Sequence, residues 1–290
     1  MLSNSQITAK TRAIAIIGDP ISHSITPRIQ NVALRAAGLD FCNLAFRVAP
    51  ENLREAVFGA RALGFLGLMV TIPHKEAILE LCDELHSSAA KLGAGNLLHF
   101  REDGQIVGHS SDGWGAVQSL REHDFRLGGK HVTILGAGGS ARSLALCFAD
   151  ENVASIRFVN RTVSRAQILA DELEKNGVSA SVFAPENVEN ALDGADLLVN
   201  TTSVGMTPQP EQTPLEKRFL RPDLAVYDIV YNPLETRLLR EAREIGAKAI
   251  DGLGMLIYTN VYAAKVCANA EISFGIMREE ALRALGFAVS

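Results

Sequence analysis

The 290-residue chain has little of what proteins that bind nucleic acids or membranes need. Its 28 lysines and arginines are outnumbered by 33 aspartates and glutamates, so the net charge of −5 offers no basic field to a nucleic acid. No apolar run is long enough to span a bilayer, and Met1–Gln6 lacks the apolar core of a signal peptide. We therefore expect a cytoplasmic protein whose partners include neither nucleic acid nor a membrane.

Cysteine is also sparse, and its placement excludes two further classes. The four cysteines, Cys42, Cys82, Cys147 and Cys267, are scattered, which favours buried thiols in a reducing compartment over a disulfide framework. Neither they nor the seven histidines have the close spacing of metal ligands, so we predict no metal site. The apolar share of 47% is ordinary for a globular protein, and the length predicts about two domains.

What the chain does contain is a glycine-rich turn at Gly136-Ala137-Gly138-Gly139-Ser140-Ala141, directly after the apolar run Val132–Leu135. The spacing Gly136-x-Gly138-x-x-Ala141 is a dinucleotide-binding fingerprint, in which the small residues permit a tight turn and the approach of a pyrophosphate. The following helix would offer free N–H groups to the phosphates. Alone, the pattern also fits an ordinary strand-to-helix turn, so its context matters.

The context is an alternation of strands and helices in both halves, which predicts an α/β protein of two domains with mostly parallel sheets. The expected strands are 13–17, 41–48, 65–70, 96–100, 105–107, 132–135, 155–159, 197–200, 225–229 and 247–250. The expected helices are 27–37, 51–63, 75–85, 141–149, 164–176, 188–192 and 234–245, with an apolar helical tail from residue 252 that packs back on the first domain. The second half is expected to be Rossmann-like.

The end of the second strand of that half indicates which dinucleotide is bound. An NAD-selective site usually has a carboxylate there, but this chain has Asn160-Arg161-Thr162 followed by Arg165. Arginine suits a 2′-phosphate because it is always charged and donates in a fork. We therefore predict NADP(H), although solvated arginines at a helix start would look the same. Thr202, Ser203 and Val204 follow another strand and are expected to line the same crevice.

Motifs over nearly the whole chain resemble the shikimate/quinate dehydrogenase family, and they occur in that family's order. They are Gly18–Pro27, Val70–Lys75, Gly93–Asn96, Asp112–Gly113, Gly136–Arg142, Asn160–Thr162, Asp228–Tyr231 and Asp251–Leu256. The resemblance implies a substrate domain from both chain ends, 1–111 and 252–290, and an NADP domain over 112–251. It places the active site in the cleft where the two meet.

The resemblance also implies residue roles. Lys75 would transfer the hydroxyl proton and Asp112 would pair with it, although a solvated lysine and a helix N-cap are the plain local interpretations. The substrate, a small ring hydroxy acid, would be bound by Ser24, Thr26, Thr71, Asn96, Tyr231 and Thr259. The cofactor would be bound by Gly136, Ala137, Gly138, Gly139, Ser140, Ala141, Asn160, Arg161, Thr162, Arg165, Thr202, Ser203, Val204, Ile229 and Gly252.

Departures from the family pattern fall on the substrate side. The first loop has Ser24-x-Thr26 instead of Ser-x-Ser, a change that the resemblance associates with quinate-using members. Met69 replaces an asparagine, Ser110-Ser111-Asp112 replaces Asn-Thr-Asp, and Thr259 stands where a glutamine is common. Because a polar site discriminates through hydrogen bonds, these changes can alter the preferred ring acid.

Three functions therefore stay open. The first is an NADP-dependent dehydrogenase that interconverts shikimate and 3-dehydroshikimate, as a monomer or homodimer, with quinate as the alternative substrate. The second is an enzyme for a less hydroxylated or amino-substituted ring, favoured by Met69 and Thr259. The third is a weakly catalytic NADP-binding sensor or regulatory protein, against which the retained Lys75 and Asp112 argue.

Overall fold

The computed structural model describes residues 7–288, and the chain divides into two compact units. The terminal unit is Met1–Ser111 with Ile257–Ser290, and the central unit is Asp112–Leu256. The chain therefore passes from the terminal unit to the central unit after Ser111. It returns to the terminal unit at Ile257, which lies inside helix α9 (Leu253–Ala268). Across residues 7–288, no helix combines the length and the apolar character that crossing a membrane requires.

The sheet of the terminal unit is mixed. Within the described residues its strand order is β2-β1-β3-β5-β6-β4. The strands are β1 (Arg12–Gly18), β2 (Phe41–Arg47), β3 (Gly67–Val70), β4 (Glu84–Leu85), β5 (Leu97–Phe100) and β6 (Ile106–His109). β1 runs parallel to β2 and β3, whereas β5 is antiparallel to both β3 and β6. A turn at Gly104 joins β5 directly to β6 and makes that pair a hairpin.

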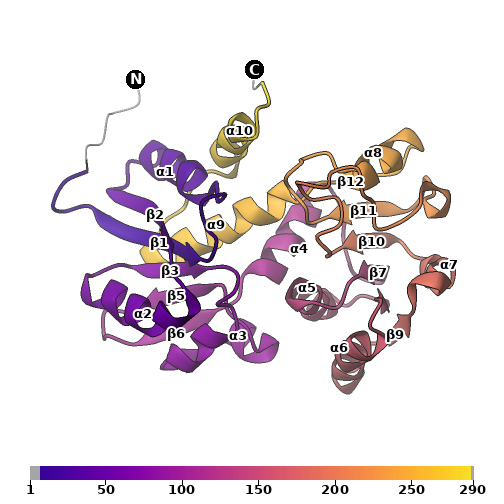
Figure 1. The fold of residues 1–290 in the computed structure, drawn as a ribbon, viewed down its shortest axis with the longest axis horizontal. Helices are drawn as coiled ribbons and strands as arrows, with labels where there is room; N and C mark the ends of the chain where they lie inside the picture. Colours follow the sequence, from indigo (N-terminus) through magenta and orange to yellow (C-terminus); the bar gives the residue numbers. More distant parts are fainter. Residues whose placement is uncertain (1–6, 289–290) are drawn as a thin grey trace. The chain divides into compact units, whose positions relative to one another are not determined.

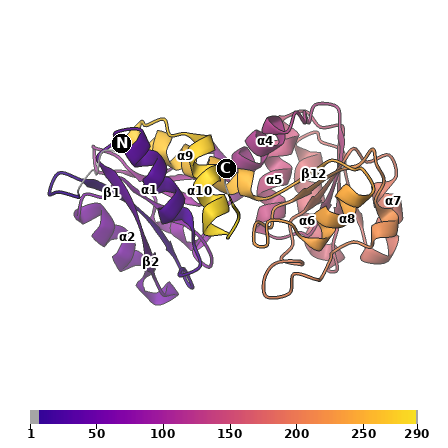
Figure 2. The ribbon, with the colours of Figure 1, turned by 90° about the horizontal axis from the view of Figure 1, so that it is seen from above.

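Helices cover both faces of this sheet, because alternate residues of the buried strands point to opposite sides. Figure 1 shows α1 (Thr26–Ala36) and α2 (Leu53–Ala62) on opposite faces. α9 packs its Ala263 and Cys267 against Ile14, Ile16 and Met69. α10 (Phe274–Ala284) lies beside α1, as Figure 2 also shows. The chain's tail thus completes the core of the terminal unit, as the sequence predicts.

The central unit has an all-parallel sheet in the order β12-β11-β10-β7-β8-β9 within the described residues. Its strands are β7 (His131–Leu135), β8 (Ser155–Val159), β9 (Ala180–Phe183), β10 (Leu197–Asn200), β11 (Ala225–Asp228) and β12 (Ala249–Ile250). Its helices are α4 (Asp112–Glu122), α5 (Gly139–Asp150), α6 (Val163–Lys175), α7 (Val188–Leu192) and α8 (Arg237–Glu244). The strand order reverses between β7 and β10, which is where open α/β sheets bind ligands.

The predicted fold class is confirmed, with some local differences. The helix predicted over 75–85 is wrong: only a short 3₁₀ turn, Ala77–Leu81, forms before Asp83 donates to the Ile106 carbonyl and draws the chain into β4. β9 was not predicted, because this four-residue edge strand is only half-buried and has no long apolar run. The helices α3 (Ser87–Leu92) and α4 (Asp112–Glu122) were not predicted either. Of the four expected buried thiols, only Cys267 is fully buried.

Candidate functional site

The glycine turn of the central unit has the geometry that a dinucleotide needs. Gly136 has φ of 108°, and a Cβ there would lie 2.7 Å from Thr201 Oγ1, so both backbone conformation and space require glycine. Around Gly138 and Gly139 nothing lies within 4 Å of a built Cβ, so this backbone is open to a ligand where α5 begins. Ala141 is fully buried against the sheet. The turn therefore fits a pyrophosphate held by a helix N-terminus.

Asn160, Arg161 and Thr162 lie beside this turn. β7 and β8 are parallel neighbours, and Gly136 N donates to the Val159 carbonyl at 2.9 Å. Asn160 Nδ2 donates to the Thr162 carbonyl at 2.8 Å, which shapes the start of α6. The side chains of Arg161 and Arg165 are exposed. Two accessible guanidinium groups next to the glycine turn fit a 2′-phosphate, and the described residues offer no carboxylate at the end of β8 for a ribose.

The buried side-chain amide of Asn200 holds the loop after β10, which is the third segment predicted to bind the cofactor. Asn200, the last residue of β10, accepts hydrogen bonds at Oδ1 from Thr202 N (3.0 Å) and Thr202 Oγ1 (2.7 Å). Its Nδ2 donates to Asp228 Oδ1 at 2.9 Å. Thr201 Oγ1 in turn donates to the Leu135 carbonyl at 2.7 Å, directly before the glycine turn. The sequence analysis assigns no role to Asn200. A polar residue at the end of an apolar strand is, however, a signal for a side chain that holds the loop after the strand.

Asp228 is the second residue whose role sequence reasoning missed. It is fully buried and accepts from Asn200, from Val230 N (3.1 Å) and from Thr236 Oγ1 (2.7 Å). Burial raises the pKa of its carboxyl to about 6, although the three hydrogen bonds oppose that shift. Asp228 therefore fixes the loop after β11, which carries Ile229 and Tyr231. Burial likewise raises the pKa of Tyr231.

Gly252 packs against the backbone of Ile229. A Cβ at residue 252 would lie 2.2 Å from the Ile229 carbonyl oxygen, so no other residue fits without displacing the loop. Asp251 Oδ1 then accepts from Leu253 N at 3.0 Å, at the start of α9. The predicted cofactor positions after β7, β8, β10, β11 and β12 thus all lie at the carboxyl edge of one sheet.

A cavity of about 250 Å³ opens beside Leu135 and Val159, the last residues of β7 and β8. Its other walls are Pro185, Glu186, Val188, Thr213, Pro214, Leu215, Glu216, Arg218 and Phe219. No sequence motif marks the segment 213–219, because its turns and its 3₁₀ element have no hydrophobic period.

In the terminal unit, three loops meet at the carboxyl end of β3. Val70 N donates to the Asn96 carbonyl at 2.8 Å, and Gly95 N donates to the Lys75 carbonyl at 2.7 Å. Thr71 N donates to the Ile17 carbonyl at 3.0 Å. The structure therefore brings Thr71, Lys75 and Asn96 together. His74, which is buried and 2.8 Å from the Val48 carbonyl through Nε2, anchors the lysine loop.

The loop after β1 is one of the three loops that meet at the end of β3. Asp19 N donates to the Ile72 carbonyl at 3.0 Å, which ties this loop to the one that carries Lys75. Ser24 Oγ accepts from Thr26 N at 3.3 Å, and Thr26 is buried at the first turn of α1. The terminal unit thus presents hydroxyl, amide and ammonium groups from three loops, the functional groups that a ring hydroxy acid requires.

Asp112 belongs to the central unit, whereas Lys75 belongs to the terminal unit. Its neighbour Ser111 donates to Asn96 Oδ1 from both N (2.8 Å) and Oγ (3.1 Å). On the other side, Gly113 N donates to Ser143 Oγ at 3.0 Å, and a Cβ at Gly113 would lie 2.4 Å from the Ser143 carbonyl. The chain on both sides of Asp112 is therefore firmly held.

The residues that depart from the family pattern are also buried. Thr259, on α9, is 7% exposed and Met69 is 6% exposed. Asn43 Nδ2 lies 3.8 Å from Met69 Sδ and donates to Gln30 Oε1 at 2.5 Å. Gln30 Nε2 donates to the Asn260 carbonyl, next to Thr259, at 3.1 Å. A buried polar network thus connects α1, β2 and α9 behind Met69.

Comparisons with known proteins agree with this arrangement. Residues 16–98 match the family described as the shikimate dehydrogenase substrate binding domain, and residues 119–216 match shikimate / quinate 5-dehydrogenase. The chain is 44% identical to shikimate dehydrogenase (NADP(+)) of Methanopyrus kandleri, over 96% of this chain and 98% of that protein.

Solved structures give the same result. A crystal structure of shikimate dehydrogenase in complex with NADP+ superposes with a TM-score of 0.91 at 39% identity, covering 97% of this chain and 98% of that one. A quinate dehydrogenase from Corynebacterium glutamicum in complex with NAD superposes with a TM-score of 0.87 at 30% identity, covering 94% and 99%. Within residues 7–288, no group of three or more histidines, cysteines or carboxylates is arranged to hold a metal ion. By fold, local geometry and relatedness, the chain belongs to the shikimate dehydrogenase family.

Proposed function

We propose that this protein is an NADP-dependent shikimate dehydrogenase that interconverts shikimate and 3-dehydroshikimate. The observation that carries the proposal is the convergence of Lys75, Thr71 and Asn96 at the end of β3, in a chain whose relatives act as shikimate dehydrogenases. Hydroxyl and amide groups suit a polyhydroxylated ring, and an amine suits proton transfer to its hydroxyl oxygen.

In this proposal NADP+ supplies the acceptor for the hydride that leaves the ring carbon. Lys75 Nζ takes the hydroxyl proton when shikimate is oxidised and returns it in the reverse direction. The carboxylate of Asp112 pairs with Lys75 and orients it. Ser24, Thr26, Thr71, Asn96, Tyr231 and Thr259 bind the ring's hydroxyl and carboxylate groups.

The central unit holds the cofactor. Gly138, Gly139 and the N-terminus of α5 receive the pyrophosphate, because their backbone is open at this point. Arg161 and Arg165 bind the 2′-phosphate, which distinguishes NADP+ from NAD+. Thr202, Ser203, Val204, Ile229 and Gly252 complete the cofactor contacts.

The test is a set of four kcat/KM values, for shikimate and quinate, each with NADP+ and NAD+. The expected order places shikimate with NADP+ highest, and NAD+ weaker by about tenfold or more because one charge-assisted contact is lost. Equal values for the two cofactors would contradict the role of the arginines. No turnover of either acid, together with tight NADPH binding, would favour the sensor.

Quinate is the second candidate substrate. Thr26 is buried at the position where the family usually has serine, and its extra methyl group reshapes the pocket without removing the hydroxyl. The similar fold of a quinate dehydrogenase supports this second candidate. A higher kcat/KM for quinate than for shikimate in the same assay would establish this alternative.

A further inference from the structure

Ser111, the last residue of the terminal unit before the chain enters α4, holds the side chain of Asn96. It donates to Asn96 Oδ1 from its backbone N at 2.8 Å and from its Oγ at 3.1 Å. Both residues are buried, since Ser111 is 2% exposed and Asn96 is 8% exposed. Ser111 has no part in the mechanism proposed above, although it contacts one of the residues assigned to the substrate.

The main chain of Asn96 is fixed from both sides by neighbouring segments. Its N donates to the His109 carbonyl at 2.9 Å, and its carbonyl accepts from Val70 N at 2.8 Å. The backbone of Asn96 therefore has little freedom, and what remains to be set is the direction of its side chain. Ser111 sets that direction, because both of its hydrogen bonds end on the side-chain oxygen.

The bonds from Ser111 also determine which end of the amide is which. A backbone N–H can only donate, so the atom 2.8 Å from Ser111 N has to be the amide oxygen of Asn96. Nδ2 is then the other end of the amide, and it has only N–H groups to offer a ligand. A hydroxyl, carbonyl or carboxylate oxygen can accept from such a group, whereas an ammonium group cannot.

We propose that Ser111 is a positioning residue, which holds the Asn96 amide so that Nδ2 donates to an oxygen of the bound ring acid. The proposal rests on the proposed function, because Asn96 contacts substrate only if the protein binds such an acid. Without the Ser111 hydroxyl, one hydrogen bond instead of two would hold Oδ1, and the amide would turn more freely. Binding would then have to order the amide, which weakens the affinity for the acid.

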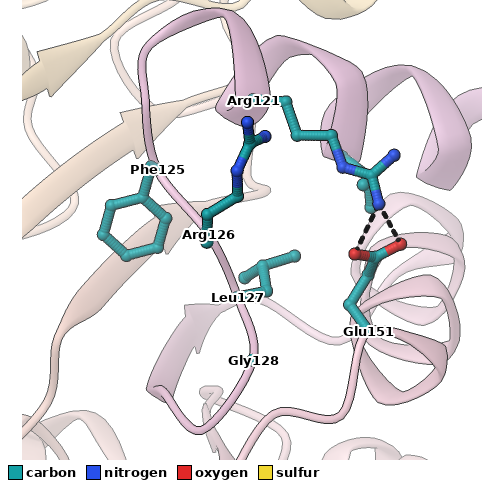
Figure 3. Close-up of a pocket in the computed structure, with 7 residues that line it drawn as sticks. Arg121, Phe125, Arg126, Leu127, Gly128 and Glu151 are labelled. Atoms are coloured by element: carbon teal, nitrogen blue, oxygen red, sulfur yellow. Dashed lines mark hydrogen bonds and ion pairs between the residues drawn. The ribbon is translucent and has the colours of Figure 1, made fainter.

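Helix α4, which follows Ser111, has anchors of its own. Near its start, Gly113 N donates to Ser143 Oγ at 3.0 Å. Near its end, Arg121 Nη2 donates to both oxygens of Glu151, at 2.8 and 2.7 Å, as Figure 3 shows. Loss of the Ser111 hydroxyl should therefore act on the amide that it holds and not on the placement of α4.

Ser143 offers a matched control. It is a buried serine, 3% exposed, whose hydroxyl holds the residue that follows Asp112, just as Ser111 precedes it. Ser143→Ala removes that hydroxyl and leaves both hydrogen bonds from Ser111 to Asn96 in place. A purely structural role at the start of α4 would make Ser143→Ala and Ser111→Ala alike.

The first test measures kcat and KM for shikimate with NADP+, and the Kd of shikimate by calorimetry, on the full chain. Ser111→Ala should raise KM and Kd about 3–10-fold. It should leave kcat within about twofold, because the cost of ordering the amide is the same for the bound substrate and the transition state. Ser143→Ala should leave the KM for shikimate within about twofold.

A pair of variants with the same shape isolates the hydroxyl. Ser111→Thr keeps the donor and should retain the wild-type KM. Ser111→Val has a methyl group in place of the threonine hydroxyl and should raise KM about 3–10-fold, as Ser111→Ala does. Equal KM values for the threonine and valine variants would overturn the proposal.

A spectroscopic measurement reports on the amide itself. In protein labelled with 15N-asparagine, the Nδ2 resonance pair of Asn96 is assigned by its absence from Asn96→Ala. Saturating shikimate should shift this pair in the wild type, because an N–H of Nδ2 gains an oxygen acceptor. A pair that does not move when shikimate binds would overturn the proposal, whatever the kinetics of the variants.

The outcomes separate this proposal from the proposed function. A wild-type protein that neither binds nor turns over shikimate overturns both. A wild-type protein that turns over shikimate, with Ser111→Ala within about twofold of its KM, overturns the positioning role alone. An equal rise of KM in Ser143→Ala and Ser111→Ala also overturns that role, because both serines would then act only by stabilising the start of α4.

Discussion

The terminal unit contains a buried basic side chain, His109, whereas the central unit contains a buried acidic side chain, Asp228. In the terminal unit, His109 is 7% exposed, its ring stacks on His86 at 4.7 Å, and its Nδ1 lies 3.2 Å from Tyr262 Oη. Burial, with smaller effects from His86 and His99, lowers its pKa to about 4. In the central unit, burial raises the pKa of Asp228 to about 6. In each case burial favours the neutral form of the side chain. A fall in pH should therefore lower the stability of the terminal unit and raise that of the central unit.

The two units also divide the proposed chemistry, since one carries the proton-transferring lysine and the other the cofactor. Lys75→Ala should therefore lower kcat by about 10²–10⁴, because general base catalysis is lost. The affinity for NADPH, measured by fluorescence titration, should stay within about twofold. Lys91→Ala, at an exposed lysine of the same unit, is the matched control. A Lys75→Ala enzyme with near-normal kcat would remove Lys75 from the mechanism.

Acid should destabilise the terminal unit through His109. Between pH 6.5 and 4 the unfolded chain takes up a proton that the folded chain refuses, so the free energy of unfolding falls as pH falls, by up to about 3 kcal/mol. Chemical unfolding at pH 6.5 and 5 measures this slope. His109→Phe should reduce the loss by about 2 kcal/mol, whereas His23→Phe, on an exposed loop, should not. An unchanged slope in His109→Phe would refute the assignment.

Acid should stabilise the central unit through Asp228. Between pH 3.8 and 6 the folded chain keeps a proton that the unfolded chain releases, so the free energy of unfolding falls as pH rises, by up to about 3 kcal/mol. Amide exchange, corrected for its intrinsic pH dependence, resolves the two units: on acidification from pH 6.5 to 5, protection should rise in β11 and fall in β6. Asp228→Asn should remove the change in β11. The same direction in both strands would contradict the comparison.

The smallest expected effect concerns cofactor choice. Arg161→Ala should raise the KM for NADP+ by about 10–100-fold, because one charge-assisted contact of about 1.5–3 kcal/mol is lost. The KM for NAD+ should not change. Arg54→Ala, an exposed arginine of the terminal unit, controls for the loss of surface charge. A parallel rise in both KM values would place Arg161 away from the 2′-phosphate.

Local patterns predicted most of the central unit, because its strands are continuous apolar runs and its glycine turn has a defined mechanical purpose. They failed at residues 75–85, where a hydrogen bond from Asp83 to the distant Ile106 overrides the helical spacing. They also missed the roles of Asn200 and Asp228. Both residues act through hydrogen-bond partners that lie in other segments of the chain. Such a tertiary network produces no periodic pattern in the sequence from which it could be predicted.

The roles of individual site residues stay predictions, but their placement can be compared with the motifs. The short motifs identified the loops that meet beside Lys75, since each follows a predicted strand. They did not identify the network of Gln30, Asn43 and the Asn260 carbonyl behind Met69. Those groups are far apart in the chain, and each alone resembles an ordinary polar residue on an amphipathic element.

The terminal unit is built from both ends of the chain, so its two parts are synthesised at different times. A ribosome that adds about 5–20 residues per second completes the central unit, residues 112–256, before it makes the residues of α9 that pack on Ile14 and Met69. During that interval one face of the sheet in the first-made segment is covered only in part, by α1. Nascent chains should therefore acquire protease resistance in the central unit first, and the segment translated earliest should be the last to mature.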